Sequence, residues 1–354
     1  MSELTTYLTQ AVNEGASDLF IVAGGPVSMK VDGQIRPMGT EKVLPPQTQQ
    51  LIAEIYQMAG RSMESYLHCG DDDFSFAVPS LARFRVNTYR QRGSLAAVVR
   101  VVSFHIPDWQ TLHIPEPVME LANLTHGMIL FSGVAGSGKS TTQACLIDRI
   151  NQTRNCHIIT LEDPIEYLHR DQKSLISQRE IAIDTADYLS ALRSCLRQAP
   201  DVILLGEMRD HETIRTAMTA AETGHLLIAT LHTHGAVNTI DRILDSFPPA
   251  QQSQVRVQLS AVLHTVVSQQ LVPGKDGTLI PAYEIMHMNN AIRSMVRDNK
   301  NYQIDNAIAA GGSEGMQSMD QSLLSLYQGG HITQETALSY ADNPDQMRRR
   351  LGIH

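Results

Sequence analysis

The order of apolar and polar positions changes near residue 105 and divides the chain into two parts. In the first part, short segments alternate apolar with polar residues, as half-buried strands do. Turns such as Gly24-Gly25 and Arg92-Gly93 separate these segments. We therefore expect a small α+β domain with an antiparallel sheet, with helices over 4–13 and 46–58 and strands over 18–22, 27–31, 74–78, 83–89 and 96–102.

In the second part, continuous apolar runs alternate with longer segments of helical periodicity. Continuous apolar runs are typical of strands that are buried on both faces. This order predicts a parallel sheet covered by helices on both faces. The expected strands are 128–131, 157–161, 202–205 and 226–231, and the expected crossover helices include 188–196 and 212–221.

The chain is thus predicted to belong to the α/β class. Two prolines, Pro107 and Pro115, mark the segment that connects the two parts and indicate a linker. The expected organisation is an N-terminal domain over 1–104, a linker over 105–114, a core over 115–285 and a helical C-terminal region over 286–354.

A glycine-rich loop follows the first buried strand and fits the spacing G-x-x-x-x-G-K-[ST]. Strand, glycine loop and helix form the context in which this motif binds nucleotide phosphates. The loop N–H groups and the helix N-terminus favour negative charge, a lysine reaches the β- and γ-phosphates, and a hydroxyl ligates Mg²⁺. The predicted nucleotide-binding residues are Gly133, Val134, Ala135, Gly136, Ser137, Gly138, Lys139, Ser140 and Thr141.

Polar residues also follow the other predicted parallel strands. Glu162 and Glu166 come after the second strand, Glu207 after the third and His232 after the fourth, while His225 opens the fourth. Each alone has an ordinary explanation: a charged strand exit, a helix cap or a core histidine. Because phosphate sites in such folds lie beyond the carboxyl ends of the strands, the set as a whole favours one site.

Composition narrows the function classes. The net charge of −9 argues against a nucleic-acid groove, which would need Lys and Arg to neutralise phosphates. The four cysteines form no C-x-x-C pair, so neither a zinc module nor a disulfide framework is indicated. No segment reaches 18 apolar residues and the N-terminus lacks a signal pattern, so we expect a cytoplasmic protein without direct membrane insertion.

Four ordered motifs resemble those of the secretion ATPase superfamily, and within it the type IV pilus retraction ATPases that drive twitching motility. The segments GVAGSGKSTT at 133–142, ITLEDPIEYLH at 159–169, LLGEMRD at 204–210 and GHLLIATLHTH at 224–234 look like that family's Walker A loop, aspartate box, Walker B and histidine box. The segment AIRSMVRDNK at 291–300 resembles an element of the retraction subfamily. The resemblance implies a RecA-like P-loop core and a PAS-like N-terminal domain.

The resemblance also implies ATP and Mg²⁺ as ligands and assigns roles to the site residues. Glu207 would orient the attacking water, with Glu162 and Glu166 contacting the metal shell or that water. Ser140, Glu162 and Glu207 are the expected metal contacts. His225 and His232 would sense the γ-phosphate rather than act as bases.

The negatively charged transition state of phosphoryl transfer needs cations beyond Lys139 and Mg²⁺, and arginines of the N-terminal domain are the candidates. By resemblance, Arg85 and Arg100 are fingers that reach the ATP of the next subunit of a homo-hexamer. Arg83 shares a face with Arg85 by strand periodicity, and a solvated sheet face is the alternative explanation. Arg193 and Arg197, one helical turn apart, form a weaker candidate pair.

The leading function is a hexameric motor that retracts type IV pili from the inner face of the cytoplasmic membrane, with a pilus platform protein of that membrane as partner. An assembly or secretion ATPase is less favoured, because the tetracysteine insertion of those relatives is absent. A non-catalytic ATP-binding regulatory subunit and a DNA-translocating motor are further alternatives. The amphipathic segment 288–298, with Ile292 and Met295, either packs on its own domain or couples the motor to retraction.

This chain departs from the family pattern at several positions. Val134-Ala135 stand where Pro-Thr is common but contribute backbone to the loop, and Phe20 stands where a His is frequent. Ala199 stands where the family usually has an acidic residue, and His234 replaces a usual Asn. The substitutions bear on the rate and detail of turnover and leave the prediction of nucleotide binding unchanged.

Overall fold

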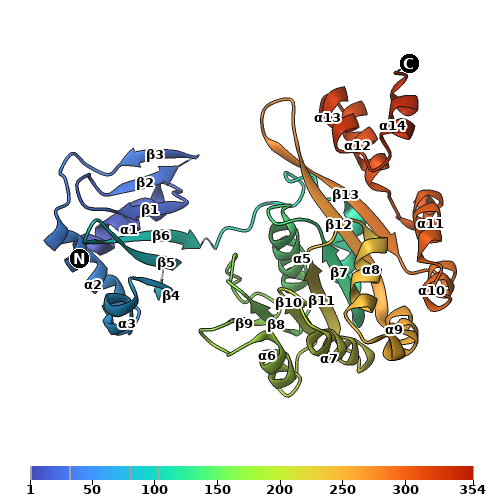
Figure 1. The fold of residues 1–354 in the computed structure, drawn as a ribbon, viewed down its shortest axis with the longest axis horizontal. Helices are drawn as coiled ribbons and strands as arrows, with labels where there is room; N and C mark the ends of the chain where they lie inside the picture. Colours follow the sequence, from blue (N-terminus) through green and yellow to red (C-terminus); the bar gives the residue numbers. More distant parts are fainter. Residues whose placement is uncertain (1, 32, 80, 103, 354) are drawn as a thin grey trace. The chain divides into compact units, whose positions relative to one another are not determined.

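The computed structural model describes residues 2–31, 33–79, 81–102 and 104–353. The chain forms two compact units (Figure 1). The first contains residues 1–105 together with Ile165–Leu168, and the second contains Ile106–Pro164 and His169–His354.

The first unit is built on a six-stranded sheet with the order β3-β2-β1-β6-β5-β4, and all neighbouring strands are antiparallel. The predicted antiparallel sheet is therefore confirmed. Strand β3 and helix α3 were missed, because β3 is exposed throughout and α3 is short. The elements are α1 (Glu3–Asn13), β1 (Asp18–Ile21), β2 (Ser28–Val31), β3 (Gln34–Pro37), α2 (Pro45–Met58), α3 (Glu64–Cys69), β4 (Asp71–Val78), β5 (Ala82–Gln91) and β6 (Ser94–Val102).

The two faces of this sheet differ in chemistry. On one face, Leu19, Val86 and Val99 are fully or almost fully buried and pack in a core with side chains of α1 and α2. Since successive residues of a strand point to opposite faces, Arg85 and Arg100 lie on the other face.

The second unit contains a seven-stranded sheet with the order β13-β12-β7-β11-β10-β8-β9. Six strands are parallel, as predicted for the core, but β13 pairs with β12 in the antiparallel direction. The reason is the short connection from Pro273 to Leu279, which permits only a hairpin. The strands are β7 (Gly127–Ser132), β8 (His157–Glu162), β9 (Leu175–Glu180), β10 (Val202–Leu205), β11 (Leu226–Leu231), β12 (Leu263–Pro273) and β13 (Leu279–His287).

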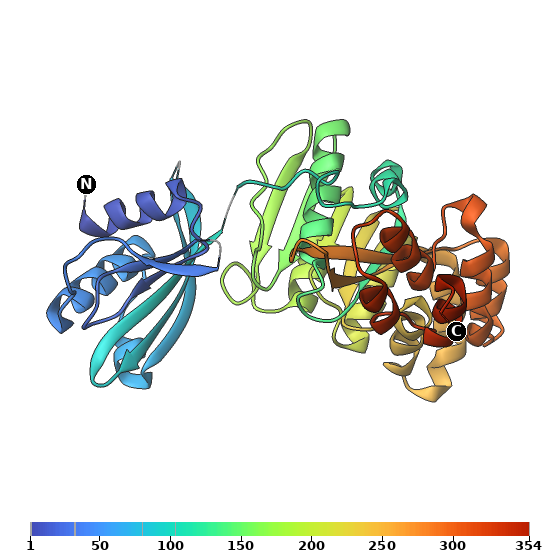
Figure 2. The ribbon, with the colours of Figure 1, turned by 90° about the horizontal axis from the view of Figure 1, so that it is seen from above.

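Helices cover both faces of this sheet, as the sequence predicted (Figure 1, Figure 2). Ile129 and Phe131 of β7 pack in the core that contains α4 and α5, whereas Met128 and Leu130 pack in the core on the opposite face. The alternation explains why β7 is apolar at successive positions. The first of these cores contains helices α4 (Glu116–Glu120) and α5 (Lys139–Thr153). The core on the opposite face contains α6 (Tyr188–Cys195), α7 (His211–Glu222), α8 (Ala236–Asp245), α9 (Pro249–Val262) and α10 (Asn290–Arg297).

The C-terminal region is helical, as expected. Helix α10 corresponds to the amphipathic segment 288–298, and its Ile292 and Val296 are fully buried in the main core. Met295 is partly buried against the same core. These contacts favour the packing explanation for the apolar side of α10. The last helices, α11 (Ile304–Ala310), α12 (Met319–Gln328), α13 (Gln334–Ser339) and α14 (Pro344–Leu351), complete the unit, and a smaller core joins α12 and α14 to β12 and β13.

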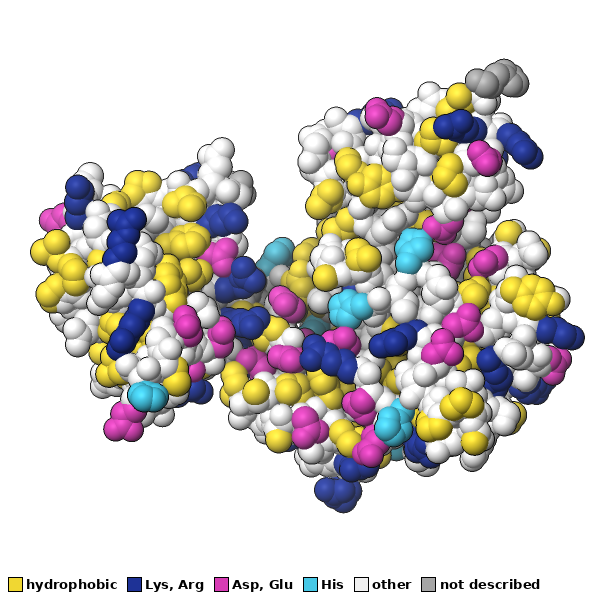
Figure 3. Space-filling view, viewed as in Figure 1, with side chains coloured by type: hydrophobic (Ala, Val, Ile, Leu, Met, Phe, Trp, Pro, Cys, Tyr) yellow, Lys and Arg dark blue, Asp and Glu magenta, His cyan; other side chains and the backbone are white. Residues whose placement is uncertain are grey.

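One face of the molecule shows no strong segregation of charge. On the face drawn in Figure 3, Lys and Arg side chains are interspersed with Asp and Glu. None of the helices in the described part of the chain has the length and apolar character that a membrane crossing requires.

Candidate nucleotide-binding site

The loop between β7 and α5 has a backbone shape that only glycine permits at two positions. Gly133 has a φ of 141° and Gly138 a φ of 86°, both in the region that side chains disfavour. A Cβ atom at Gly133 would overlap the carbonyl oxygen of Gln269, and one at Gly138 would lie 2.8 Å from the Gln269 side-chain amide nitrogen. The loop therefore sits directly on β12, and its close approach depends on both glycines.

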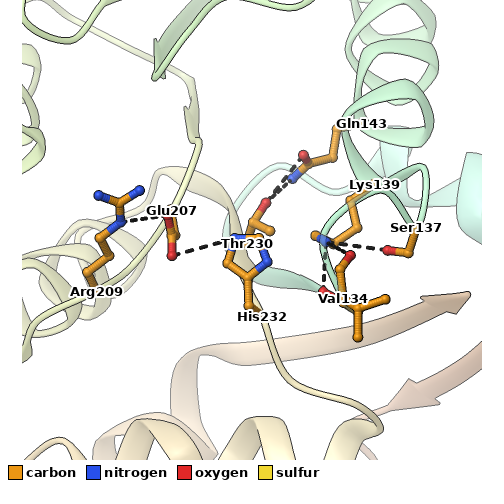
Figure 4. A network of polar contacts seen from close by, with 9 residues as sticks. Val134, Ser137, Lys139, Gln143, Glu207, Arg209, Thr230 and His232 are labelled. Carbon is orange, nitrogen blue, oxygen red and sulfur yellow. Dashed lines mark hydrogen bonds and ion pairs between the residues drawn. The ribbon is translucent and has the colours of Figure 1, made fainter.

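Lys139 is held inside this loop. Its ammonium group donates hydrogen bonds to the carbonyl oxygens of Gly133 at 2.7 Å and Val134 at 2.8 Å, and to Ser137 Oγ at 3.3 Å (Figure 4). Burial lowers the pKa of Lys139, and the charge of Glu207 partly opposes this effect. The loop thus carries a nearly buried cation, with only 6% of the residue exposed, at the point where the motif places phosphates.

The N-terminus of α5 adds a second feature suited to anions. The first N–H groups of a helix have no partner within the helix and carry a partial positive charge. Ser140 is the second residue of α5 and is exposed, and Thr141 is half-buried beside it. The Ser140 hydroxyl is therefore accessible to a ligand at this loop.

Glu207 lies just after β10 and contacts side chains of two other segments. Its Oε2 accepts a hydrogen bond from Arg209 Nε at 2.6 Å, and its Oε1 lies 3.5 Å from His232 Nε2. Figure 4 shows Glu207 and His232 between Arg209 and the Lys139 loop. The Glu207 side chain is only 20% exposed, so its charge acts in a partly desolvated place. The structure thus brings together three of the predicted site residues: Lys139, Glu207 and His232.

Glu162 ends β8, the strand next to β10. Its Oε1 accepts hydrogen bonds from Thr160 Oγ1 at 2.6 Å and from Gln178 Nε2 at 3.3 Å. Leu161 pairs with Leu205 across the two strands, so Glu162 and Glu207 leave the sheet at the same edge. The two carboxylates therefore come from adjacent strand ends.

These groups offer oxygen ligands of the kind that Mg²⁺ prefers. Within the described residues, no cluster of three or more His, Cys, Asp or Glu side chains can hold a metal by itself. Mg²⁺ commonly binds through one or two carboxylates, together with substrate phosphates, water and at times a hydroxyl group. Ser140, Glu162 and Glu207 fit that pattern.

Several residues that support the loop carried no signal in the sequence. Gln143 of α5 donates to Thr230 of β11 at 3.0 Å, and Thr142 donates to Gln269 Oε1 at 2.9 Å. These buried contacts fix the first turns of α5 against the sheet. Glutamine and threonine occur in many helices and strands, so no spacing rule identifies them. Arg209 was also missed, although it stands in the quoted LLGEMRD segment.

The structure does not bring His225 to this loop. His225 precedes β11, whose first residue, Leu226, pairs with Gly127 at the amino end of β7. Gly133 follows the carboxyl end of the same strand, and a strand of six residues is about 20 Å long. The His225 ring instead lies 2.9 Å from the Ala220 carbonyl oxygen. The predicted contact between His225 and a nucleotide bound in this loop is therefore not supported.

Three other predicted residues, Glu166, Arg193 and Arg197, are exposed. Glu166 is exposed and belongs to Ile165–Leu168, the segment that groups with the first unit. Arg193 pairs with Glu212 at 3.3 Å, and Arg197 donates to the Arg193 carbonyl, so both have local partners on the surface of α6.

The predicted fingers lie in the first unit. Arg85 of β5 and Arg100 of β6 are directly opposite each other in adjacent strands. Arg83 is two positions from Arg85 on the same strand, and Phe84 between them is fully buried. Because successive residues of a strand point to opposite faces, this burial agrees with the expectation that Arg83 and Arg85 share the other face.

Comparisons with known proteins agree with this geometry. The family model described as "Type II/IV secretion system protein" matches residues 2–297. The chain is 42% identical over 343 residues to the type IV pilus retraction ATPase PilT of Pseudomonas aeruginosa, covering 97% of this chain and 99% of that protein. It is 41% identical over 347 residues to a twitching motility protein of Neisseria gonorrhoeae, covering 98% and 92%.

A solved structure gives the same result for the fold. The crystal structure of the pilus retraction motor PilT with bound ADP is similar to this chain with a TM-score of 0.89 and 42% identity, over 99% of both chains. The predicted α/β fold, with a RecA-like core, an α+β N-terminal part and a helical C-terminal region, is confirmed. The motifs and these comparisons together show that the chain belongs to the type II/IV secretion system protein family.

Proposed function

We propose that this protein is an ATP-hydrolysing motor that retracts type IV pili. The observation that carries the proposal is the nearly buried Lys139, held in a glycine loop at the same sheet edge as Glu162 and Glu207. Full-length similarity to a pilus retraction ATPase supports the biological role. The solved relative holds ADP, which is the product expected of this chain.

The loop and its lysine bind the triphosphate. The N–H groups of the loop and of the α5 N-terminus hold the phosphates, and Lys139 exchanges its contacts with loop carbonyl oxygens for contacts with the β- and γ-phosphates. Ser140, Glu162 and Glu207 would hold Mg²⁺, which when bound would supply positive charge to neutralise the phosphates. Positioning and charge neutralisation supply most of the rate in phosphoryl transfer.

Glu207 orients the attacking water. A carboxylate that is held at one oxygen by Arg209 keeps its other oxygen toward His232 and the loop. That oxygen accepts a hydrogen bond from water and increases its nucleophilic character. His232, at 3.5 Å from Glu207, then responds to the presence or loss of the γ-phosphate.

The active form is a homo-hexamer in which Arg85 and Arg100 reach the ATP of the adjoining subunit. Their placement on the face of the N-terminal sheet away from its core is compatible with this role. The motor acts at the inner face of the cytoplasmic membrane on a pilus platform protein. Glu166 remains a candidate contact for the metal shell or the water.

Two experiments test the proposal. In the purified protein, Glu207→Gln should lower ATP turnover about a hundredfold or more while ATP binding is kept, because the charge that orients the water is lost and the phosphate loop with Lys139 is intact. Unchanged turnover would instead indicate a regulatory subunit.

Deletion of the gene tests the direction of movement. Loss of a retraction motor should leave abundant surface pili and abolish twitching. Loss of surface pili in the deletion strain would identify an assembly ATPase and contradict the proposal.

A further inference from the structure

A row of charged side chains crosses the sheet of the first unit on the face opposite its core. The strand register places Lys30 opposite Asp18, Asp18 opposite Arg100, Arg100 opposite Arg85 and Arg85 opposite Ser75. Residues directly opposite in antiparallel strands share a face. The row therefore contains three cations and one carboxylate.

One pair of residues in this row opposes the stability of the sheet. Like charges directly opposite each other in adjacent strands are destabilising, and Arg85 and Arg100 form such a pair. The apolar core lies on the other face, where Leu19 and Val99 are fully buried. The two arginines therefore need an explanation outside the packing of their own domain.

Asp18 holds Arg100 by the Nε edge of its guanidinium group. Its Oδ1 accepts a hydrogen bond from Arg100 Nε at 3.0 Å, and its Oδ2 accepts one from Ser17 Oγ at 2.9 Å. The Asp18 side chain is only 9% exposed, whereas the Arg100 side chain is 61% exposed. The carboxylate is thus fixed in the sheet while the arginine remains accessible.

The hydrogen bond uses Nε of Arg100, and this choice of nitrogen determines which N–H donors remain for another partner. A guanidinium group is planar and carries five N–H donors in a fixed geometry. When Nε is held by a carboxylate, one terminal N–H lies parallel to Nε–H on the same edge, and the other three N–H donors of the two terminal nitrogens point away from that edge. An ion pair this exposed on its cationic side stabilises the fold little, so its main effect is to orient the guanidinium.

We propose that Asp18 is a positioning residue for ATP hydrolysis, because it fixes Arg100 so that its terminal nitrogens meet the γ-phosphate bound by an adjoining copy of the chain. The inference rests on the proposed function, in which Arg100 is a finger. The carboxylate also offsets the repulsion between Arg100 and Arg85, which lets two arginines stand side by side.

Asp18→Asn in the full-length oligomer tests the inference, since it removes the charge and keeps the size. The kcat for ATP should fall about tenfold to a hundredfold, because a misplaced catalytic group has an effect of this order. The affinity for ATP should change less than about twofold, since the loop of the binding subunit is intact. Asp18→Glu, which keeps the charge, should restore part of the kcat.

Asp72→Asn is the matched control. Asp72 pairs with Arg61 at 3.1 Å in the same unit and also accepts a hydrogen bond from Tyr56, on the face that packs against α2. This variant should lose stability and keep its kcat. An equal loss of kcat in both variants would assign Asp18 a structural role and overturn the inference.

Arg100→Ala separates the inference from the function on which it rests. If Arg100→Ala keeps its kcat, Arg100 is not a finger and Asp18 positions nothing. If Arg100→Ala loses its kcat and Asp18→Asn does not, the finger role stands and the positioning role is refuted. A rise in kcat in Asp18→Asn would mean that the carboxylate holds Arg100 away from the phosphate, which also refutes the inference.

Discussion

Glu284 is a buried carboxyl group on β13, and its replacement by glutamine should remove a pH dependence of stability. The residue is 6% exposed, and its Oε1 accepts a hydrogen bond from the Ala236 N–H, at the start of α8, at 2.7 Å. Burial raises the pKa of Glu284 from 4.5 to about 7, and the Ala236 N–H and His234 oppose the rise. Nearby Asp342 contributes to the rise.

The sign of the effect follows from proton linkage. Between pH 4.5 and about 7, the folded protein keeps a proton on Glu284 that the unfolded chain has released. The free energy of unfolding therefore falls as pH rises through this interval. Since each pKa unit corresponds to about 1.4 kcal/mol, the rise of the Glu284 pKa corresponds to a fall of about 3 kcal/mol. Glutamine can accept the same hydrogen bond and does not titrate.

Urea unfolding at pH 5 to 9 measures this effect. The chain has one tryptophan, Trp109, which packs against the core that contains α5, so its fluorescence reports on the unit that contains Glu284. Glu284→Gln should exceed the unfolding free energy of the wild type least at pH 5 and by about 3 kcal/mol above pH 7.

The control is Glu212→Gln, which changes an exposed carboxylate on α7. Its ion pair with Arg193 is more than half exposed on both sides, so its loss should have little effect at any pH. Parallel pH profiles for Glu284→Gln and the wild type would refute the reasoning, because they would show that Glu284 binds no extra proton in the folded state.

Three further predictions follow from backbone shape and from one ion pair. Gly133→Ala should weaken ATP binding, measured by calorimetry, at least about a hundredfold, because the added methyl group would overlap the Gln269 backbone. Gly136→Ala adds a methyl group in open space and should weaken the free energy of ATP binding by only about 1 kcal/mol. Similar losses of binding in the two variants would contradict the packing argument. Ala199 has a φ of 51°, so Ala199→Gly should raise the free energy of unfolding by up to about 1 kcal/mol, and a decrease would show that this conformation carries no strain. His234 Nε2 lies 2.7 Å from Asp342 Oδ1, and this contact raises the pKa of His234. The pair therefore stabilises the fold fully below pH 6.5, and this stabilisation is lost as pH rises through the pKa of the folded protein. The melting temperature of His234→Asn should differ from that of the wild type more at pH 6 than at pH 9, and an equal difference at both pH values would exclude the charge effect.

The main strands and the phosphate loop could be predicted because their signals are local. Buried parallel strands are continuous apolar runs, and β7, β10 and β11 stand within one residue of the predicted ranges. The glycine loop is defined by spacing, and Gly133 and Gly138 adopt the backbone shapes that the motif requires.

The parts that sequence reasoning missed depend on distant contacts. Strand β9 has half-buried polar residues and therefore lacks the apolar run that marks a buried strand. Strand β12 carries the buried Gln269, which contacts the phosphate loop and Thr142, residues that are far away in the chain. For His225 the signal was available: a residue that precedes a parallel strand lies at the amino edge, away from the phosphate loop.

A mixing experiment tests the central claim, that ATP is hydrolysed between the loop of one copy and the arginines of another. Lys139→Ala subunits lack the loop cation and keep Arg100, whereas Arg100→Ala subunits keep the loop. Each variant alone should be nearly inactive, and co-assembled oligomers should regain ATP turnover because some sites combine an intact loop with an intact arginine. Turnover that stays at the level of the separate variants, or full activity of Arg100→Ala alone, would contradict the account.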